Sequence, residues 1–340
     1  HDRLLNGFYI HAMGGDRIRT RKCFLWFYYL NGRHPYVYFH ENIQRQMTKL
    51  TAHSEYGMIH SLLIKSATQA FRSEEYLMSQ WRQLNYLALP DFKKSLQEYE
   101  EFVQLLQMSC SMLHQMPASD DVKIDSIYCR DAAISTNGGM IICRMGKIGR
   151  ANEPAQEKRF FEEKGINILG EISAPGTLEG GDVAWLDEHT LAVGHTYRTN
   201  EAGIEQLKVL LKPLDVEVIV SEMPHYNGPQ DVFHLMSVLS PIDRNLAVVY
   251  SRLMPIKFRN ELLNRGFELI EVPDGEFDSM GCNVLAIAPR KVLMVAGNPV
   301  TQTRLENVGV SVFTYQGSEI SVKGGGGPTC LTRPILRTHE

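Results

Sequence analysis

From Asp131 onward, apolar and polar positions recur in one fixed order. Each unit has two short apolar strands joined by a turn, then an amphipathic helix, then one further strand. The paired strands are predicted at 132–134 with 140–143, 183–186 with 190–193, 235–239 with 246–250, and 284–287 with 292–295. Turn-forming residues separate the two members of each pair, for example Asn137-Gly138-Gly139 and the stretch from Pro241 to Asn245.

A helix is expected after each strand pair. The helices are predicted at 153–164, 201–212, 255–265 and 299–307, and the strands that follow them at 166–169, 216–220, 267–271 and 310–314. Gly165, Gly266 and Gly309 stand where a left-handed residue would end a helix. Asn200 is placed as an N-cap. The pattern therefore predicts four ββαβ units in succession.

The spacing of these units is even. The residues at the entry to each strand pair recur at intervals of about 50 residues, as expected of a repeat architecture; they are Asp131, Asp182, His234, Cys282 and Cys330. A fifth unit must combine both ends of the chain, with a strand at 58–65, a helix at 92–106 and a strand at 330–336 that would pair beside 58–65. Closing the ring in this way leaves no exposed sheet edge.

The sequence thus predicts an α/β fold, a five-bladed propeller with pseudo-fivefold ββαβ repeats. We expect this domain to span 54–340 and to follow an N-terminal extension, 1–53, whose structure the sequence does not indicate. A chain of 340 residues with 44% apolar content can bury the core that such a domain needs.

Composition narrows the classes of function. A net charge of −4 gives no basic surface for nucleic acid, and no apolar run approaches the length of a membrane span. The six cysteines are scattered without paired spacing, which is typical of reduced thiols in a cytoplasmic protein rather than of disulfides or a zinc site. We expect no metal, no cofactor, no membrane and no nucleic-acid partner.

Residues at the same phase of each blade point to the same end of the propeller axis. Asp131, Glu179 with Asp182, His234 and Cys330 are therefore expected to line one pocket. Carboxylates hold a cation, a thiolate attacks it and a histidine transfers protons. Each residue also has a structural interpretation by itself: a core histidine, a turn with solvated carboxylates, an ion pair of Asp131 with Arg130, or a buried small thiol. Because all of these residues occupy the same position of the repeat, we favour the shared pocket over the separate structural roles.

The segment before Cys330 is a glycine run, Gly324-Gly325-Gly326-Gly327-Pro328-Thr329. Such a run lets the backbone approach a ligand closely. A phosphate-binding loop would need a GK[ST] sequence and a helix after the glycines, and neither follows here.

Together these segments resemble the guanidino-group-modifying enzymes of the pentein superfamily, which include arginine deiminases, dimethylarginine dimethylaminohydrolases, agmatine deiminases and glycine amidinotransferases. The resemblance extends from Ser54 to Arg337. It rests on Arg130-Asp131, Leu178-Glu179-Gly180-Gly181-Asp182, Arg198-Thr199-Asn200, His234-Leu235 and the glycine run ending at Cys330.

The resemblance implies a role for each matching residue. Cys330 matches the nucleophile, His234 the general acid and base, and Glu179 the carboxylate that pairs with the histidine and the guanidinium. Asp131 matches a second guanidinium-binding carboxylate and Arg198 the arginine that meets a substrate α-carboxylate. Asp182 would shape the turn and support the site. Met236 stands where deiminases and amidinotransferases carry an aspartate, a departure that favours substrates with a substituted guanidino nitrogen.

We therefore expect a cysteine-dependent hydrolase that cleaves a C–N bond of dimethylarginine or arginine through a covalent S-alkylthiouronium intermediate and releases citrulline. Transfer of the amidino group to an acceptor amine is the alternative. A non-catalytic ring resembling the ribosome-associated penteins is a third reading, which would need neither the cysteine nor the Glu–His pair. The partner is a small guanidino molecule, and the sequence leaves open whether the chain is a monomer or a homodimer.

Overall fold

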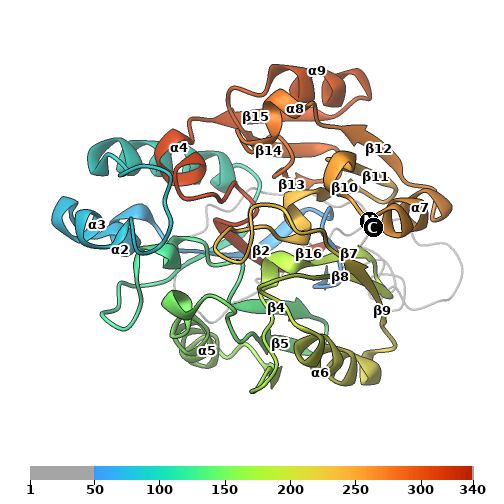
Figure 1. Cartoon of the computed structure of the whole chain (residues 1–340), viewed down its shortest axis with the longest axis horizontal. Helices are drawn as coiled ribbons and strands as arrows, with labels where there is room; N and C mark the ends of the chain where they lie inside the picture. Colours follow the sequence, from blue (N-terminus) through green and yellow to red (C-terminus); the bar gives the residue numbers. More distant parts are fainter. Residues whose placement is uncertain (1–49, 339–340) are drawn as a thin grey trace, which may run out of the picture. The chain divides into compact units, whose positions relative to one another are not determined.

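Five small sheets form a ring in the unit Thr48–Glu340 (Figure 1). The structure, a computed structural model, describes residues 50–338. Four of the sheets have three strands, the first two antiparallel and the third parallel to the second. Their strands are β4 (Ala133–Thr136), β5 (Gly139–Ile142) and β6 (Ile168–Glu171); β7 (Val183–Asp187), β8 (Thr190–His195) and β9 (Glu217–Glu222); β10 (Leu239–Asp243), β11 (Leu246–Val249) and β12 (Glu268–Glu271); and β13 (Leu285–Ala288), β14 (Lys291–Val295) and β15 (Ser311–Tyr315). The predicted five-bladed α/β propeller is confirmed.

The fifth sheet combines the two ends of the described chain, in the order β1-β16-β2-β3. Its strands are β1 (Leu50–Thr51), β2 (Ile59–Ile64), β3 (Met112–Gln115) and β16 (Thr332–Thr338). β16 pairs antiparallel with β2, as predicted. Leu50 and Thr51, assigned from the sequence to the extension, form a short strand on β16. Residues 1–49 of the predicted extension lie outside the described residues, and the boundary at residue 54 stays a prediction.

Helices connect the second and third strands of each repeat. The five predicted helices are α5 (Glu153–Glu163), α6 (Glu201–Leu211), α7 (Ile256–Asn264), α9 (Pro299–Asn307) and, in the fifth blade, α4 (Phe92–Gln107). The fifth blade also carries α2 (Ala67–Phe71) and α3 (Glu74–Gln80), and α8 (Asp274–Phe277) precedes β13. Gly165, Gly266 and Gly309 have φ of 69°, 81° and 80°, which confirms the left-handed ends. The Asn200 side chain accepts a hydrogen bond from the Gly203 N–H at 2.9 Å, which confirms the N-cap.

One predicted strand is displaced. The stretch 235–239 was expected to be a strand, but Leu235–Ser237 forms a 3-10 turn and β10 begins at Leu239. Pro241, read as part of the turn, lies inside β10 opposite Ala247, next to an irregularity in register. A bulge tolerates a residue that cannot donate to the ladder, and the apolar run alone could not distinguish a turn from a strand. His234 consequently stands before a helical turn.

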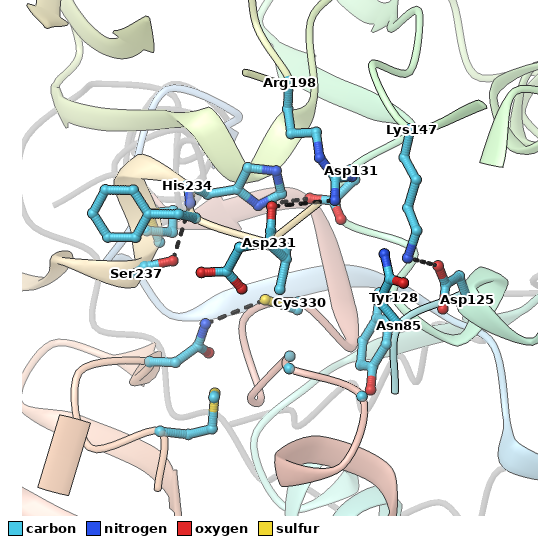
Figure 2. A pocket seen from close by; sticks show the side chains of 18 of the residues that line it. Asn85, Asp125, Tyr128, Asp131, Lys147, Arg198, Asp231, His234, Ser237 and Cys330 are labelled. Carbon is cyan, nitrogen blue, oxygen red and sulfur yellow. Dashed lines mark hydrogen bonds and ion pairs between the residues drawn. The ribbon is translucent and has the colours of Figure 1, made fainter. Parts of the chain in front are cut away.

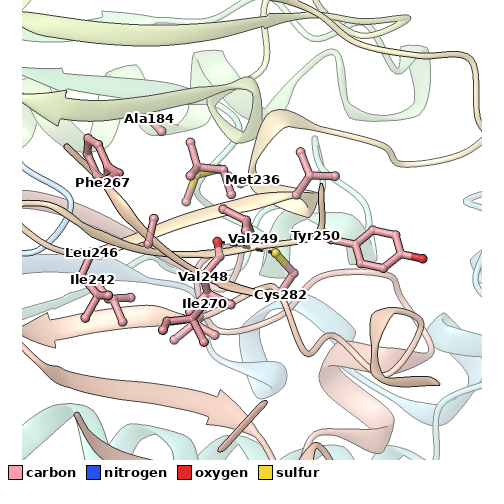
Figure 3. Close-up of a cluster of buried hydrophobic side chains, with 14 of the residues drawn as sticks. Ala184, Met236, Ile242, Leu246, Val248, Val249, Tyr250, Phe267, Ile270 and Cys282 are labelled. Carbon is pink, nitrogen blue, oxygen red and sulfur yellow. Dashed lines mark hydrogen bonds between the residues drawn. The ribbon is translucent and has the colours of Figure 1, made fainter. Parts of the chain in front are cut away.

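Apolar side chains fill the space between blades. The cluster in Figure 3 joins β7, β10 to β12 and β13 through side chains such as Ala184, Leu246, Ile270 and Ala286. Each strand pair buries both faces, which explains the short continuous apolar runs of the sequence. None of the helices in the described part of the chain is long and apolar enough to cross a membrane.

Candidate active site

A cavity of about 580 Å³ opens at the end of the ring where the strand-pair entries meet (Figure 2). Five of the seven predicted site residues border it: Asp131, Arg198, His234, Met236 and Cys330. Glu179 and Asp182 do not border the cavity and are fully buried, and both interact with the segment that carries His234. Asp182, expected from the sequence to shape the turn and support the site, therefore contacts the segment that carries His234 and not the cavity.

Asn283 holds both Cys330 and the loop that precedes it. The Asn283 side chain donates from Nδ2 to the Cys330 sulfur at 3.2 Å and accepts from the Thr329 N–H at 3.0 Å (Figure 2). A Cβ on Gly327 would lie 2.6 Å from the Asn283 oxygen, so the glycine permits this approach. Burial and the nearby Asp131 carboxylate raise the pKa of Cys330 to about 11, and the Asn283 hydrogen bond acts in the opposite direction. The thiol is therefore protonated at neutral pH in the ligand-free protein.

His234 is paired with a carboxylate. Its Nε2 lies 2.8 Å from Glu179 Oε2, and its backbone N–H donates to the Ser237 hydroxyl at 3.1 Å. Burial acts against the charged ring, but Asp182, Asp131 and Glu179 outweigh it and raise the pKa of His234 to about 9. Burial likewise disfavours the Glu179 carboxylate, yet the hydrogen bond with His234 and the charges of His234 and Arg198 hold the pKa of Glu179 below its usual value. The pair is an imidazolium and a carboxylate at neutral pH.

Asp131 keeps one oxygen free. Its Oδ2 accepts from Arg150 Nη1 at 2.5 Å. Oδ1 is buried, has no hydrogen-bond partner among residues 50–338, and lies 4.0 Å from His234 Nδ1. Arg150 is held in turn by Glu153, with Nη2 and Oε2 2.7 Å apart. An unpaired buried acceptor is costly unless a ligand supplies a donor.

The glycine pair before Asp182 sets the spacing of these groups. A Cβ on Gly181 would lie 2.4 Å from His234 Nδ1 and 2.7 Å from Asp131 Oδ1. Asp182 accepts from the Leu235 N–H at 3.1 Å and from the Thr196 hydroxyl at 2.7 Å. Burial raises the pKa of Asp182 to about 6. These contacts fix the turn that carries His234.

Two more cations border the cavity near its rim. The Arg198 guanidinium lies 3.4 Å from Glu179 Oε1 and donates to the Asp231 carbonyl at 3.4 Å. Lys147 donates to Asp125 Oδ2 at 2.7 Å (Figure 2), and its backbone N–H donates to Glu179 Oε1 at 3.0 Å. An anionic group of a ligand that also reaches Cys330 would meet these side chains.

The carboxylates and the histidine could also hold a metal ion. Within residues 50–338, Asp131, Glu179 and His234 offer three ligand atoms that lie within 4.8 Å of one another. A metal would require a neutral His234, whereas the neighbouring carboxylates stabilise its protonated form. A planar cation with several N–H donors matches the free oxygen of Asp131 without any loss of a proton.

Comparison with known proteins identifies the family. The model for "N,N dimethylarginine dimethylhydrolase, eukaryotic" matches residues 71–337. The chain belongs to this family. A dimethylarginine dimethylaminohydrolase of Pseudomonas aeruginosa is 27% identical over 252 residues, 73% of this chain and 91% of that protein. An arginine deiminase of Listeria welshimeri is 26% identical and covers 88% of this chain, with 80% of its own length aligned.

Solved structures agree with the fold. The Pseudomonas aeruginosa dimethylarginine dimethylaminohydrolase complexed with citrulline superposes with a TM-score of 0.63 at 24% identity, covering 81% of this chain and 98% of that one. The N-terminal domain of ArgZ, a cyanobacterial arginine dihydrolase, superposes with a TM-score of 0.68 at 17% identity, covering 82% and 97%. The predicted membership in the guanidino-group-modifying enzymes, and the predicted enzyme class of hydrolases acting on linear amidines, are confirmed.

Sequence reasoning missed several side chains in the cavity of this dimethylarginine dimethylhydrolase family member. Asn283, Arg150, Lys147 and Asp125 were not singled out. Asn283 directly follows Cys282 at the entry to a blade, so its position in the repeat could have identified it. The other three lie on connections whose course the repeat pattern does not determine. Cys282, the other cysteine at a blade entry, is buried in the apolar cluster of Figure 3, and burial raises the pKa of its thiol far above the usual value.

Proposed function

We propose that the protein hydrolyses a C–N bond of the guanidino group of an arginine-type substrate and releases citrulline. The observation that carries this proposal is the free, buried Oδ1 of Asp131 on a cavity wall that also presents the Cys330 thiol and the His234 imidazolium. A guanidinium group supplies the donors that this oxygen lacks. Charge-assisted hydrogen bonds of this kind are among the strongest in proteins.

Binding of the cation prepares the nucleophile. A positive charge beside Cys330 offsets the Asp131 charge that raises the pKa of the thiol. The thiol proton passes to solvent, and the thiolate keeps the hydrogen bond from Asn283. The sulfur then attacks the guanidinium carbon and a C–S bond forms, which gives a tetrahedral adduct.

His234 supplies the proton for the leaving group. Its imidazolium donates a proton to the departing nitrogen, the C–N bond breaks, and an S-alkylthiouronium remains on Cys330. The neutral imidazole then accepts a proton from water, whose oxygen attacks the same carbon. The C–S bond then breaks as the carbonyl forms, the hydroxyl proton passes to solvent, and the Cys330 thiolate and citrulline are released. Glu179, at 2.8 Å, holds the ring through both steps.

Met236 supports a preference for N-substituted arginines. It borders the cavity and is buried among the apolar side chains of Figure 3. A thioether accepts hydrogen bonds weakly but offers dispersion contacts to methyl groups. The family model that matches the chain bears a dimethylarginine name, which favours the same choice. At the other end of the substrate, Arg198 is our candidate for the α-carboxylate.

A substrate panel tests the proposal. Purified protein is incubated with dimethylarginine, arginine and agmatine, and the ureido product and the released amine or ammonia are quantified. We expect citrulline from dimethylarginine, at a rate at least equal to that from arginine. A Cys330→Ser variant should form no product, whereas the control Cys282→Ser should retain activity.

Two outcomes would contradict the proposal. Absence of ureido product from every guanidine, with an intact fold, would exclude hydrolysis. Product that appears only when an acceptor amine such as glycine is added, with the amidino group on that amine, would assign the site to amidino transfer. Mass spectrometry of acid-quenched protein tests the covalent step by searching for an adduct on the peptide that contains Cys330.

A further inference from the structure

Three arginine side chains are buried inside the ring, away from the active-site cavity. Arg333 and Arg337 lie on β16, and Arg130 lies directly before β4. Their exposed fractions are 4%, 1% and 1%. None of the three borders the cavity that contains Cys330. Arginine is almost never buried to this degree without a partner for its charge.

Hydrogen bonds connect these side chains to two neighbouring strands, to two loop carbonyls and to one carboxylate. Arg333 Nη2 donates to the Arg130 carbonyl at 2.9 Å. Arg130 Nη2 donates to Glu55 Oε1 at 2.7 Å and to the β7 carbonyl of Val183 at 3.4 Å. Arg337 Nη1 donates to the Gly57 carbonyl at 2.6 Å and to the β13 carbonyl of Ala286 at 2.8 Å. The cluster therefore spans the interior between β16, β4, β7 and β13.

The three guanidinium groups influence one another electrostatically. Burial and the charge of Arg130 lower the pKa of Arg333 to about 10. Burial, followed by the charges of Arg130 and Arg333 and opposed by Glu55, lowers the pKa of Arg337 to about 10. All three groups still carry a full positive charge at neutral pH.

The carboxylates near the cluster carry less negative charge than the three arginines carry positive charge. Glu55 is the carboxylate that pairs with Arg130. Glu157 acts on Arg333, and burial raises the pKa of Glu157 well above its usual value. Even an ionised Glu157 would leave one positive charge in excess. Uncompensated buried charge is strongly unfavourable.

Several donors in the cluster also lack an acceptor. Five guanidinium nitrogens have no hydrogen-bond partner among the described residues: Nε and Nη1 of Arg130, Nε of Arg333, and Nε and Nη2 of Arg337. Parts of Glu55 and Arg333 remain accessible, at 7% and 4% exposure. Excess positive charge and free donors are features of an anion site.

We propose that Arg130, Arg333 and Arg337 bind one small monovalent inorganic anion, such as chloride, inside the propeller. The anion would accept hydrogen bonds from the free guanidinium nitrogens and offset the excess charge. Such a site stabilises the folded ring, because the anion binds the assembled cluster and not the unfolded chain. No residue of the cluster borders the catalytic cavity.

Bromide diffraction tests the location of the site directly. Crystals of the unaltered protein are grown or soaked in sodium bromide, and anomalous data are collected at the bromine edge. We expect an anomalous peak within hydrogen-bond distance of at least two of the three guanidinium groups. Electron density with no anomalous signal at the cluster would mean that water alone solvates the arginines, and it would overturn the proposal.

Thermal unfolding tests the energetic effect with matched variants. The midpoint temperature is measured in sodium chloride and in sodium gluconate at equal ionic strength. We expect chloride to raise it by a few degrees and the rise to saturate with concentration. The rise should disappear in Arg333→Met and persist in the control Arg159→Met, whose side chain is exposed beside Asp121. Equal chloride and gluconate curves for the unaltered protein would contradict the proposal, and the bromide experiment still decides if Arg333→Met fails to fold.

Discussion

Replacing Gly181 by alanine tests the geometry of the catalytic pair with a single methyl group. The added Cβ would lie 2.4 Å from His234 Nδ1 and 2.7 Å from Asp131 Oδ1. Ordinary van der Waals contact begins at 3.4 Å, so the imidazole must move by about 1 Å. The movement disturbs its 2.8 Å hydrogen bond with Glu179. A misplacement of about 1 Å in an active site costs on the order of 100-fold in rate.

We therefore expect Gly181→Ala to lower kcat/KM for citrulline formation about 100-fold. Overpacking of a close contact costs about 1–3 kcal/mol, so thermal unfolding should remain cooperative at a lower midpoint. The steady-state rate with dimethylarginine and the thermal melt are measured on the same preparation. The two readouts separate a displaced imidazole from a protein that no longer folds.

Gly275 provides the matched control. It lies in α8, and a Cβ there would have no atom within 4 Å. Gly275→Ala should leave activity within about twofold and stability within about 0.5 kcal/mol. If Gly181→Ala retained activity within twofold of the unaltered enzyme, the placement of His234 and Asp131 against Gly181 would be wrong, and with it the proposed proton transfer.

The remaining predictions concern the nucleophile, its neighbour, the imidazolium and substrate choice. Cys330→Ser should abolish turnover and change stability by less than about 1 kcal/mol, since it removes little packing; measurable turnover would assign the chemistry to another residue. Asn283→Ala should lower kcat/KM about 10- to 100-fold, because hydrogen bonds to charged groups contribute about 1.5–3 kcal/mol. The same variant should shift iodoacetamide alkylation of Cys330 to higher pH, and an unchanged alkylation profile would exclude a role for Asn283. The pKa of His234 is raised to about 9, so the protonated ring stabilises the fold fully below about pH 6.5, its unfolded pKa, and this contribution is lost as the pH rises through 9. The melting temperatures of the unaltered protein and of His234→Asn should therefore converge between these pH values. Parallel curves would refute the assignment. Met236→Asp should shift relative kcat/KM towards arginine by about tenfold or more, because the new carboxylate would pair a guanidinium N–H whose unsatisfied burial costs about 1–3 kcal/mol. If the unaltered enzyme turned over arginine quickly and left dimethylarginine unchanged, the argument would fail.

The sequence by itself determined the repeat and the residues at its entries. Short continuous apolar runs and helix stops such as Gly165 are local signals, because each arises from hydrogen bonding and burial within one blade. Their recurrence at intervals of about 50 residues indicates the repeat. Ring closure followed from the same pattern, since the strand at 330–336 had no partner except the one at 58–65. The shared pocket of Asp131, His234 and Cys330 then followed from pseudo-symmetry.

Tertiary structure decided what each side chain contacts. The hydrogen bond from Asn283 to Cys330, the ion pair of Asp131 with Arg150 and the burial of Asp182 behind His234 depend on loop paths between blades. Loops obey no short period, so no local pattern encodes their course. The cluster of Arg130, Arg333 and Arg337 shows the same limit. An arginine in a strand is ordinarily read as exposed, and only the closed ring brings three of them into one buried space.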